Sequence, residues 1–343
     1  MYIPEYNFDI DMTTDSGRAF VYDPKGVDQA AFISGYSVGV ALGKKEVLIK
    51  VIAAGLNPVD YKLPQAMPMA LLRGKPWGQD VCGKVTRVGS KVTSFAVDDV
   101  VCGFGRGLAE YAVVSCSEIV KVPEGVPHEV AGSLGVAGLT AYQMLKCNGA
   151  FEGTEPKSIL VIGASGGVGS LVVQIARALC VAGTTIHGMC SARSAEFVKS
   201  LGVDAIIDYT VPGFSLAAAL PAGSVDVVAD CVTSPDDYDY VPEGMPLIKP
   251  KTGKYVAINS SSKMDWVKCI AGSKLGIRMF RGQYSLLLCT HDARDLESVV
   301  GLIRDGKLRV HIHSKETFDE TSIRKAYAEL KGRRVHGKVV VVM

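Results

Sequence analysis

The sequence predicts an α/β protein in which a compact domain of short strands precedes a doubly wound parallel sheet. A glycine-rich turn at residues 158–170 separates a strand-like apolar run from a helix-like one. Short apolar strands alternate with helix-compatible stretches after it, which is typical of a parallel sheet covered by helices. Before this turn, short β-rich segments are punctuated by glycine and proline, which favours a barrel-like first domain.

The glycine-rich turn is the most informative segment. Its sequence, SILVIGASGGVGS, matches the pattern G-x-G-x-x-G at Ala164, Gly166 and Gly169, with alanine in the first glycine position. A strand before such a turn and a helix after it direct backbone N–H groups at a dinucleotide pyrophosphate. The turn therefore predicts a dinucleotide site, and an ordinary strand-to-helix turn is the alternative.

The strands expected around this turn are short. Those of the first domain are expected at 18–22, 46–54, 81–88 and 111–114, and those of the sheet after the turn at 184–189, 205–207, 225–230, 254–259 and 284–289. A helix is expected at 195–201. The apolar segment 284–289 is a candidate edge strand, although a buried central strand would look the same. An exposed edge invites pairing with a second copy of the chain, so we expect a homodimer.

The end of the strand at 184–189 indicates which dinucleotide binds. NAD-dependent enzymes usually carry Asp or Glu there to bind the ribose 2′-hydroxyl, but this chain has no carboxylate between Gly169 and Arg193. It offers the Ser191 hydroxyl and the Arg193 guanidinium, which are donors suited to a 2′-phosphate. Tyr209 follows the next strand and is a further candidate. NADPH is therefore the expected cofactor, although a helix-capping serine and a solvated arginine would look the same.

Composition narrows the class of protein. The net charge is +2, which indicates no surface for nucleic acid, and no apolar run approaches the roughly 18 residues of a membrane-spanning helix. The N-terminal segment is acidic and lacks the apolar core of a signal peptide. Nine cysteines without a C-x-x-C pair fit reduced thiols. These features predict a cytoplasmic protein. His311 and His313 are expected on a solvent-facing strand rather than at a metal.

Several blocks in order carry a family resemblance. They are AAGLNPVDYK (53–62), GQDVCGKVTRVGSKVTSFAVDDVV (78–101), GLAEYAVV through VAGLTAYQML (107–145), the turn GASGGVG and the closing GKVVVVM. Together they resemble the medium-chain dehydrogenase/reductase superfamily, in its zinc-independent, quinone oxidoreductase-like branch. CSARSAEFVKSLGVDAIIDY (190–209) is similar to chloroplast-envelope quinone oxidoreductase homologues and to reticulon-interacting mitochondrial reductases.

This resemblance implies a fold and a division of the chain. The expected fold is a GroES-like β-barrel-type catalytic domain plus a Rossmann domain with a doubly wound parallel sheet, with substrate and nicotinamide meeting in the cleft between them. Residues 1–17 would be an N-terminal extension. Residues 18–130 and 290–343 would form the catalytic domain, and residues 131–289 the NADPH-binding domain.

The resemblance also implies roles for particular residues. Asn57 and Thr140 would flank the nicotinamide, although a structural turn at Asn57 and a helix cap at Thr140 are the alternatives. The remaining cofactor-binding residues would be Ser165, Gly167 and Val168 with Ala164, Gly166 and Gly169 at the pyrophosphate, Ser191, Arg193 and Tyr209 at the 2′-phosphate, and Arg334 and His336 at the border of the cofactor.

The same comparison predicts a site without metal. Zinc-dependent relatives have a cysteine where this chain has Asn57, and a His-Glu pair where it has Gln79 and Asp80. Zinc sites prefer thiolate and imidazole ligands to amides. Hydride transfer to a simple ketone leaves an alkoxide whose conjugate acid has a pKa of about 16. A quinone leaves a phenolate-like anion with a conjugate-acid pKa of about 10. Quinones and enones are therefore the acceptors that a site without metal suits best.

No proton donor is obvious from the sequence. Tyr61 and Lys62 follow Asn57 closely and are the candidates for this role. The sequence predicts an NADPH-dependent, metal-free reductase of quinones or of other activated acceptors such as enones. Two alternatives remain, an enone (2-alkenal) reductase with little activity on quinones, and a non-catalytic NADPH-binding regulatory or scaffold protein.

Overall fold

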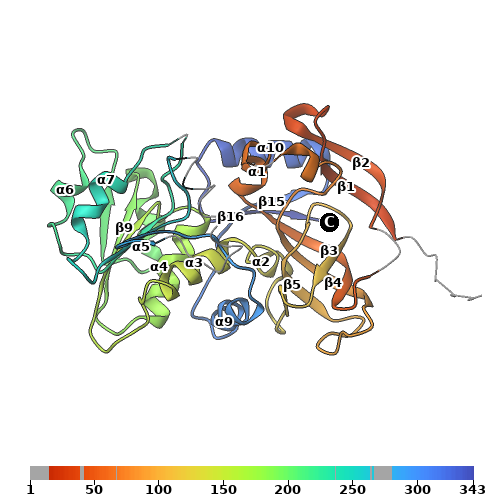
Figure 1. Cartoon of the computed structure of the whole chain (residues 1–343), viewed down its shortest axis with the longest axis horizontal. Helices are drawn as coiled ribbons and strands as arrows, with labels where there is room; N and C mark the ends of the chain where they lie inside the picture. Colours follow the sequence, from red (N-terminus) through yellow and green to blue (C-terminus); the bar gives the residue numbers. More distant parts are fainter. Residues whose placement is uncertain (1–14, 39–41, 67, 236, 263–264, 266–279) are drawn as a thin grey trace, which may run out of the picture.

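Two seven-stranded sheets and a two-stranded ribbon organise the chain (Figure 1). The computed structural model describes residues 15–38, 42–66, 68–235, 237–262, 265 and 280–343. The ribbon pairs β1 (Ser16–Tyr22) with β2 (Ala30–Ser37) in antiparallel fashion. The N-terminal extension was expected to end at residue 17, but Ser16 and Gly17 already belong to β1, where Gly17 lies opposite Tyr36.

The first seven-stranded sheet has the strand order β15-β16-β3-β4-β5-β7, with β6 also paired to β3. Its strands are β3 (Glu46–Leu56), β4 (Asp80–Val88), β5 (Val100–Phe104), β6 (Tyr111–Ser115), β7 (Ile119–Lys121), β15 (Ile312–Thr317) and β16 (Lys338–Val342). The long strand β3 pairs with β4, β6 and β16. The closing segment of the chain thus returns to the sheet built by strands β3 to β7, as the blue strands beside the orange ones show in Figure 1.

Three helices accompany this sheet, namely α1 (Pro58–Ala66), α2 (His128–Ala131) and α10 (Glu320–Lys331). In Figure 1, α1 and α10 lie side by side, and their residues share a core with Tyr22 and Trp77. Tyr327 of α10 is 5% exposed and packs edge-on against Trp77, with ring centroids 5.1 Å apart. Strand β1 and the last helix, α10, therefore contribute to one hydrophobic core.

The second seven-stranded sheet has the order β10-β9-β8-β11-β12-β14-β13, and every neighbouring pair except β13 with β14 is parallel. Its strands are β8 (Ser158–Ile162), β9 (Thr185–Cys190), β10 (Ala205–Asp208), β11 (Val227–Asp230), β12 (Lys254–Ala257), β13 (Phe280–Arg281) and β14 (Tyr284–Leu286). The helices along this part are α3 (Ala137–Lys146), α4 (Gly167–Leu179), α5 (Ala195–Ser200), α6 (Leu216–Ala219), α7 (Val241–Gly244) and α9 (Ala293–Arg304). The predicted parallel α/β sheet is confirmed.

One expectation about this sheet is wrong. The segment 284–289 was expected as an edge strand, but only Tyr284–Leu286 form β14, and β14 lies between β12 and β13. The short antiparallel strand β13 takes the edge because the chain turns back at Gly282, where φ is +64°. A strand with both sides paired cannot pair with a second copy, so the proposed homodimer loses this argument and stays a prediction.

The glycine turn between β8 and α4 has the geometry of a close approach. Gly163, one residue before the motif, takes the positive φ of +79° that opens the turn, so Ala164 can replace the usual first glycine. At Gly169 a Cβ atom would lie 2.2 Å from the carbonyl oxygen of Gly163. Only glycine lets helix α4 begin this close to the strand.

Two further expectations concern the surface. His311 and His313 are both exposed beside Ile312, where β15 begins, as expected for a solvent-facing strand. Within the described ranges, no helix is both long and apolar enough to span a bilayer. The cytoplasmic location stays a prediction.

Candidate active site

Three buried polar residues meet where the central strands of the first sheet end. Asn57 connects β3 to α1, Asp80 opens β4, and Lys338 opens β16. Because β16 and β4 flank β3 on its two sides, their first residues are brought to the end of β3. The exposed fractions are 4% for Asn57, 0% for Asp80 and 3% for Lys338.

These side chains form one hydrogen-bonded network. The Lys338 ammonium donates to Asn57 Oδ1 at 2.6 Å, to the Leu56 carbonyl oxygen at 3.1 Å and to Asp80 Oδ2 at 3.1 Å. Asn57 Nδ2 donates to the same Asp80 oxygen at 2.8 Å. All three ammonium protons have acceptors, and the carboxylate lies beside its counter-ion. A buried charge pair persists only when it is satisfied in this way.

The residues of this network do not fit a zinc ion. Asn57 and Asp80 stand at positions where zinc-dependent relatives have a cysteine and a glutamate, and both already contact the lysine ammonium. An amide and a carboxylate held by an ammonium are poor ligands for zinc, which prefers thiolate and imidazole. The described part of the chain holds no group of three His, Cys, Asp or Glu side chains with the geometry of a metal site.

The network lies directly beside the dinucleotide turn. A Cβ atom on Gly167, the first residue of α4, would lie 3.2 Å from Lys338 Cδ. The Gly337 N–H donates to the Ser165 carbonyl oxygen at 3.0 Å. The start of β16 therefore connects the turn after β8 to Asn57 and Asp80, so that a dinucleotide bound at the turn would lie close to this network.

A second buried carboxyl group adjoins the first. Asp60 Oδ2 accepts hydrogen bonds from the Asn57 backbone N–H at 2.8 Å and from the Tyr327 hydroxyl at 3.0 Å. Its other oxygen has no partner among the described residues. Burial, with a smaller contribution from the negative charge of Asp80, raises the pKa of Asp60 to about 7. A substantial fraction of this carboxyl group is therefore protonated at neutral pH.

The opposite end of the dinucleotide site has its own polar chain. Ser191 follows β9, and its Oγ lies 3.2 Å from Ser194 Oγ. The Ser194 hydroxyl is in turn hydrogen-bonded to His336 Nε2 at 2.9 Å. Arg193 is exposed and makes no hydrogen bond or ion pair with any residue in the described ranges. The structure thus links Ser191 to His336 through Ser194, and the charge of Arg193 acts on His336. The binding of a cofactor phosphate by these residues stays a prediction.

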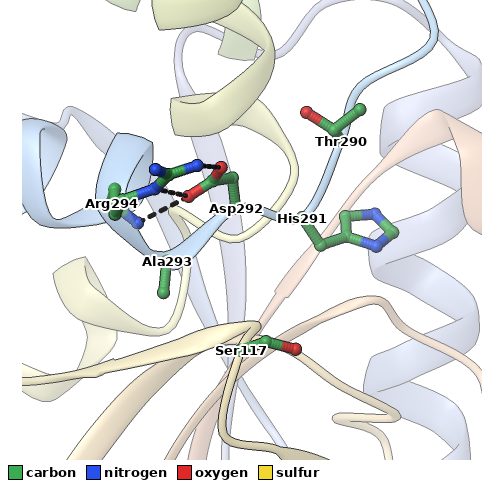
Figure 2. A pocket seen from close by; sticks show the side chains of 6 residues that line it. All are labelled: Ser117, Thr290, His291, Asp292, Ala293 and Arg294. Atoms are coloured by element: carbon green, nitrogen blue, oxygen red, sulfur yellow. Dashed lines mark hydrogen bonds and ion pairs between the residues drawn. The ribbon is translucent and has the colours of Figure 1, made fainter. Parts of the chain in front are cut away.

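A cavity of about 600 Å³ is lined by the six residues shown in Figure 2. They are Ser117 from the loop between β6 and β7, and the segment 290–294 that leads into α9. In Figure 2 the Arg294 side chain turns onto Asp292, whereas the His291 ring points the other way. The volume lies in the range of small-molecule sites.

The segment before α9 links this cavity to the expected nicotinamide position. Thr140 of α3 lies close enough to the Cys289 thiol to act on its pKa, and Gln143 of the same helix donates to the Thr290 carbonyl oxygen at 2.8 Å. The His291 ring stacks on Phe104 with centroids 3.4 Å apart and planes 11° apart. Burial lowers the pKa of His291 to about 4, although the nearby charge of Asp80 opposes this shift. The imidazole is neutral at physiological pH.

The remaining predicted residues lie around these groups. Tyr61 packs edge-on against Tyr327 at 6.2 Å and beneath the Lys331 ammonium at 5.4 Å, so its ring faces α10. Lys62 is half-buried on the same helix. Tyr209 is 45% exposed just after β10, and Arg334 is exposed two residues before His336. The roles expected for these residues stay predictions.

Comparison with known proteins agrees with this geometry. Residues 43–142 match the alcohol dehydrogenase GroES-like domain, and residues 201–341 match the zinc-binding dehydrogenase family. A chloroplast envelope quinone oxidoreductase homolog of Arabidopsis thaliana is 34% identical over 308 residues, covering 86% of this chain and 89% of that protein. The chain belongs to the medium-chain dehydrogenase/reductase family. The resemblance seen in the sequence blocks is thereby confirmed, and the chain is an oxidoreductase.

Two further relatives of this oxidoreductase are informative. An NADPH-dependent alkenal/one oxidoreductase of Arabidopsis thaliana chloroplasts is 30% identical over 338 residues, with coverage of 94% of this chain and 79% of that protein. The solved structure of the quinone oxidoreductase from Coxiella burnetii is 27% identical and has a TM-score of 0.78, with coverage of 96% and 99%. The combination of a GroES-like and a Rossmann domain is confirmed by this similarity.

Sequence reasoning missed four residues that this oxidoreductase places at the site. Asp80 appeared there only as a replaced zinc ligand, and Lys338 only as part of a closing motif. The signal for Lys338 was a lysine opening the otherwise apolar strand KVVVV. A cation at the start of a buried strand is costly unless a buried acceptor pairs with it, so such a lysine predicts a partner nearby. Ser194 and His291 gave no local signal, because their partners are distant in sequence.

Proposed function

We propose that this oxidoreductase transfers hydride from NADPH to quinones or to activated enones, without a catalytic metal. The observation that carries the proposal is the series of contacts that connects the dinucleotide turn to the cavity. Lys338 joins the turn at Gly167 to Asn57 and Asp80, and the segment from Cys289 to His291 joins Thr140 to a cavity of small-molecule size.

The cofactor is NADPH, and when bound it supplies the hydride. The turn from Gly163 to Gly169 fits its pyrophosphate, because Gly166 caps helix α4 and offers no side chain in front of the N–H groups. In the proposed arrangement, Ser165 and Val168 contact the pyrophosphate, and Ser191 and Arg193 hold the 2′-phosphate. Asn57 and Thr140 orient the nicotinamide ring toward the acceptor.

The proposed acceptor binds in the cavity beside His291 and Phe104. The neutral imidazole keeps one N–H, which can donate a hydrogen bond to the oxygen that gains negative charge. A phenolate or a delocalised enolate needs less stabilisation than an alkoxide, so one neutral donor is better matched to a quinone or an enone. The proton that completes the reduction comes from solvent through the open cavity in this scheme.

The test is NADPH oxidation by the chelator-treated protein with an aromatic ortho-quinone and with a 2-alkenal, with NADH in parallel. Turnover that survives chelation and prefers NADPH is the expected result. Loss of turnover on chelation, restored by zinc, would refute the metal-free site. Tight NADPH binding without oxidation by either acceptor would instead favour a non-catalytic NADPH-binding protein.

A further inference from the structure

An arginine and three histidines gather at the expected 2′-phosphate end of the cofactor site. Arg193 belongs to the turn after β9, whereas His311, His313 and His336 come from the segments beside β15 and β16. The His336 ring stacks on Phe197 of α5 with planes 5° apart and centroids 4.9 Å apart, and His311 contacts the same phenyl ring at 4.8 Å. The His313 ring lies edge-on to His336 at 6.4 Å.

The titratable groups that act on His336 are all basic. Arg193, His311 and His313 are the groups that act on it, and Arg309 acts on His311. The carboxylate of α5, Glu196, pairs with Lys199 at 2.8 Å instead. Three histidines and an arginine without an acidic partner form an electropositive patch in the described part of the chain, and such a patch attracts an anion.

We propose that His336 is a specificity-determining residue that binds the 2′-phosphate as an imidazolium, so that NADPH binding takes up a proton and NADH binding does not. The hydrogen-bonded chain from Ser191 through Ser194 to His336 Nε2 places the imidazole next to the predicted phosphate ligands. This inference rests on the proposed roles of Ser191 and Arg193, and it does not depend on which acceptor is reduced.

The physical reason is the change of environment on binding. Without a ligand, partial burial and the nearby charges of Arg193, His313 and His311 lower the pKa of His336. A bound phosphate dianion favours the charged imidazole and raises that pKa. Between the two pKa values, each binding event takes a proton from solvent onto His336. The contribution of His336 to NADPH affinity is therefore present at low pH and lost as pH rises through the pKa of the bound state.

The test is titration calorimetry with NADPH, with NADH and with 2′,5′-ADP at pH 7, in buffers of different ionisation enthalpy. We expect proton uptake with NADPH and 2′,5′-ADP, and none with NADH. The phosphate has a pKa of about 6, so its own titration would release protons on binding a cationic site. Titration of the phosphate alone would therefore appear as proton release, so proton uptake has to come from a protein group such as His336.

The decisive variant is His336→Gln, which keeps an amide able to bond Ser194 but cannot titrate. Its proton uptake should vanish. Its NADPH affinity at pH 6.5 should fall about tenfold, which is the magnitude of one charge-assisted hydrogen bond, and its NADH affinity should be unchanged.

Two further variants serve as controls. His336→Phe keeps the stack on Phe197 and should behave like His336→Gln, while the remote His128→Gln should match the natural protein. Proton release, uptake that persists in His336→Gln, or equal uptake with NADH would overturn the proposal. Because they measure binding, these experiments test the proposal even if the protein reduces no acceptor.

Discussion

The Lys338 ammonium lies 2.6 Å from the amide oxygen of Asn57, a residue 281 positions earlier in the chain. Both side chains are nearly inaccessible to solvent, and Asp80 accepts hydrogen bonds from both of them. The contact joins the first residue of the closing strand β16 to the end of β3. It places a fixed positive charge beside the expected nicotinamide site and holds the Asn57 amide in one orientation.

Replacing Lys338 by methionine should be strongly destabilising. The Lys338→Met change keeps the length of the side chain but leaves Asp80 as a buried carboxylate without its counter-ion, which typically costs about 3–5 kcal/mol. The free energy of unfolding, from urea denaturation monitored by circular dichroism, measures this loss. We also expect reduced turnover, because Asn57 loses the donor that orients it.

A double variant provides the control. In Lys338→Met combined with Asp80→Asn, the uncompensated charge is gone, so most of the lost stability should return while turnover stays low. If Lys338→Met alone unfolds at the same urea concentration as the natural protein, the ion pair does not have the structural role described here.

Asp60 should contribute stability that falls as pH rises from about 4 to about 7. Its pKa is raised to about 7 in the folded state by burial, so the folded protein holds a proton that the unfolded chain has already released in this range. Each pH unit within the window then costs about 1.4 kcal/mol at most. The unfolding free energy of the Asp60→Asn variant should fall less, or rise more, with pH across this window than that of the natural protein, because the lowered pKa of His291 acts in the opposite direction in both proteins. A slope equal to that of the natural protein would contradict this assignment.

Arg193 should decide between the two nicotinamide dinucleotides. It is exposed and has no partner within the described residues, so the Arg193→Ala change should leave the melting temperature unchanged. Loss of its hydrogen bonds to the 2′-phosphate should weaken NADPH binding by roughly 10- to 100-fold and leave NADH binding unaffected. Nicotinamide fluorescence measures both affinities. Lys199→Ala is the matched control, because this cation lies nearby on α5 but pairs with Glu196. If the affinities for NADPH and NADH fall equally, Arg193 does not bind the 2′-phosphate.

His291 should contribute to turnover through its N–H group. The His291→Phe change keeps an aromatic ring against Phe104 but removes the hydrogen-bond donor from the cavity, and kcat for an ortho-quinone should fall by about 10- to 100-fold. Because the pKa of His291 is lowered to about 4 by burial, its neutral form prevails from pH 5 to 8. The pH profile of the natural protein in that range should therefore show no step from this residue. An unchanged kcat in the variant would remove His291 from the proposed mechanism.

The two-part architecture was predictable because its signals are local. The glycine turn, the apolar strand at 158–162 and the amphipathic run of α4 adjoin one another in the sequence, and backbone sterics fix their geometry. Even here one detail depended on context, since Gly163 rather than the motif position Ala164 takes the positive φ. The interior position of β14 was not predictable, because an apolar strand looks the same at an edge and one place inside it.

The sequence by itself determined the order of strands and helices, the dinucleotide turn, and the residues Ser191 and Arg193 suited to a 2′-phosphate. Only the tertiary structure decided which distant residues meet. Lys338 reaches Asn57 and Asp80 because β16 returns to pair with β3, and His336 reaches Ser194 because the same closing segment passes the turn after β9. The physical reason is that a buried charge needs a partner in space, whereas the sequence records only neighbours along the chain.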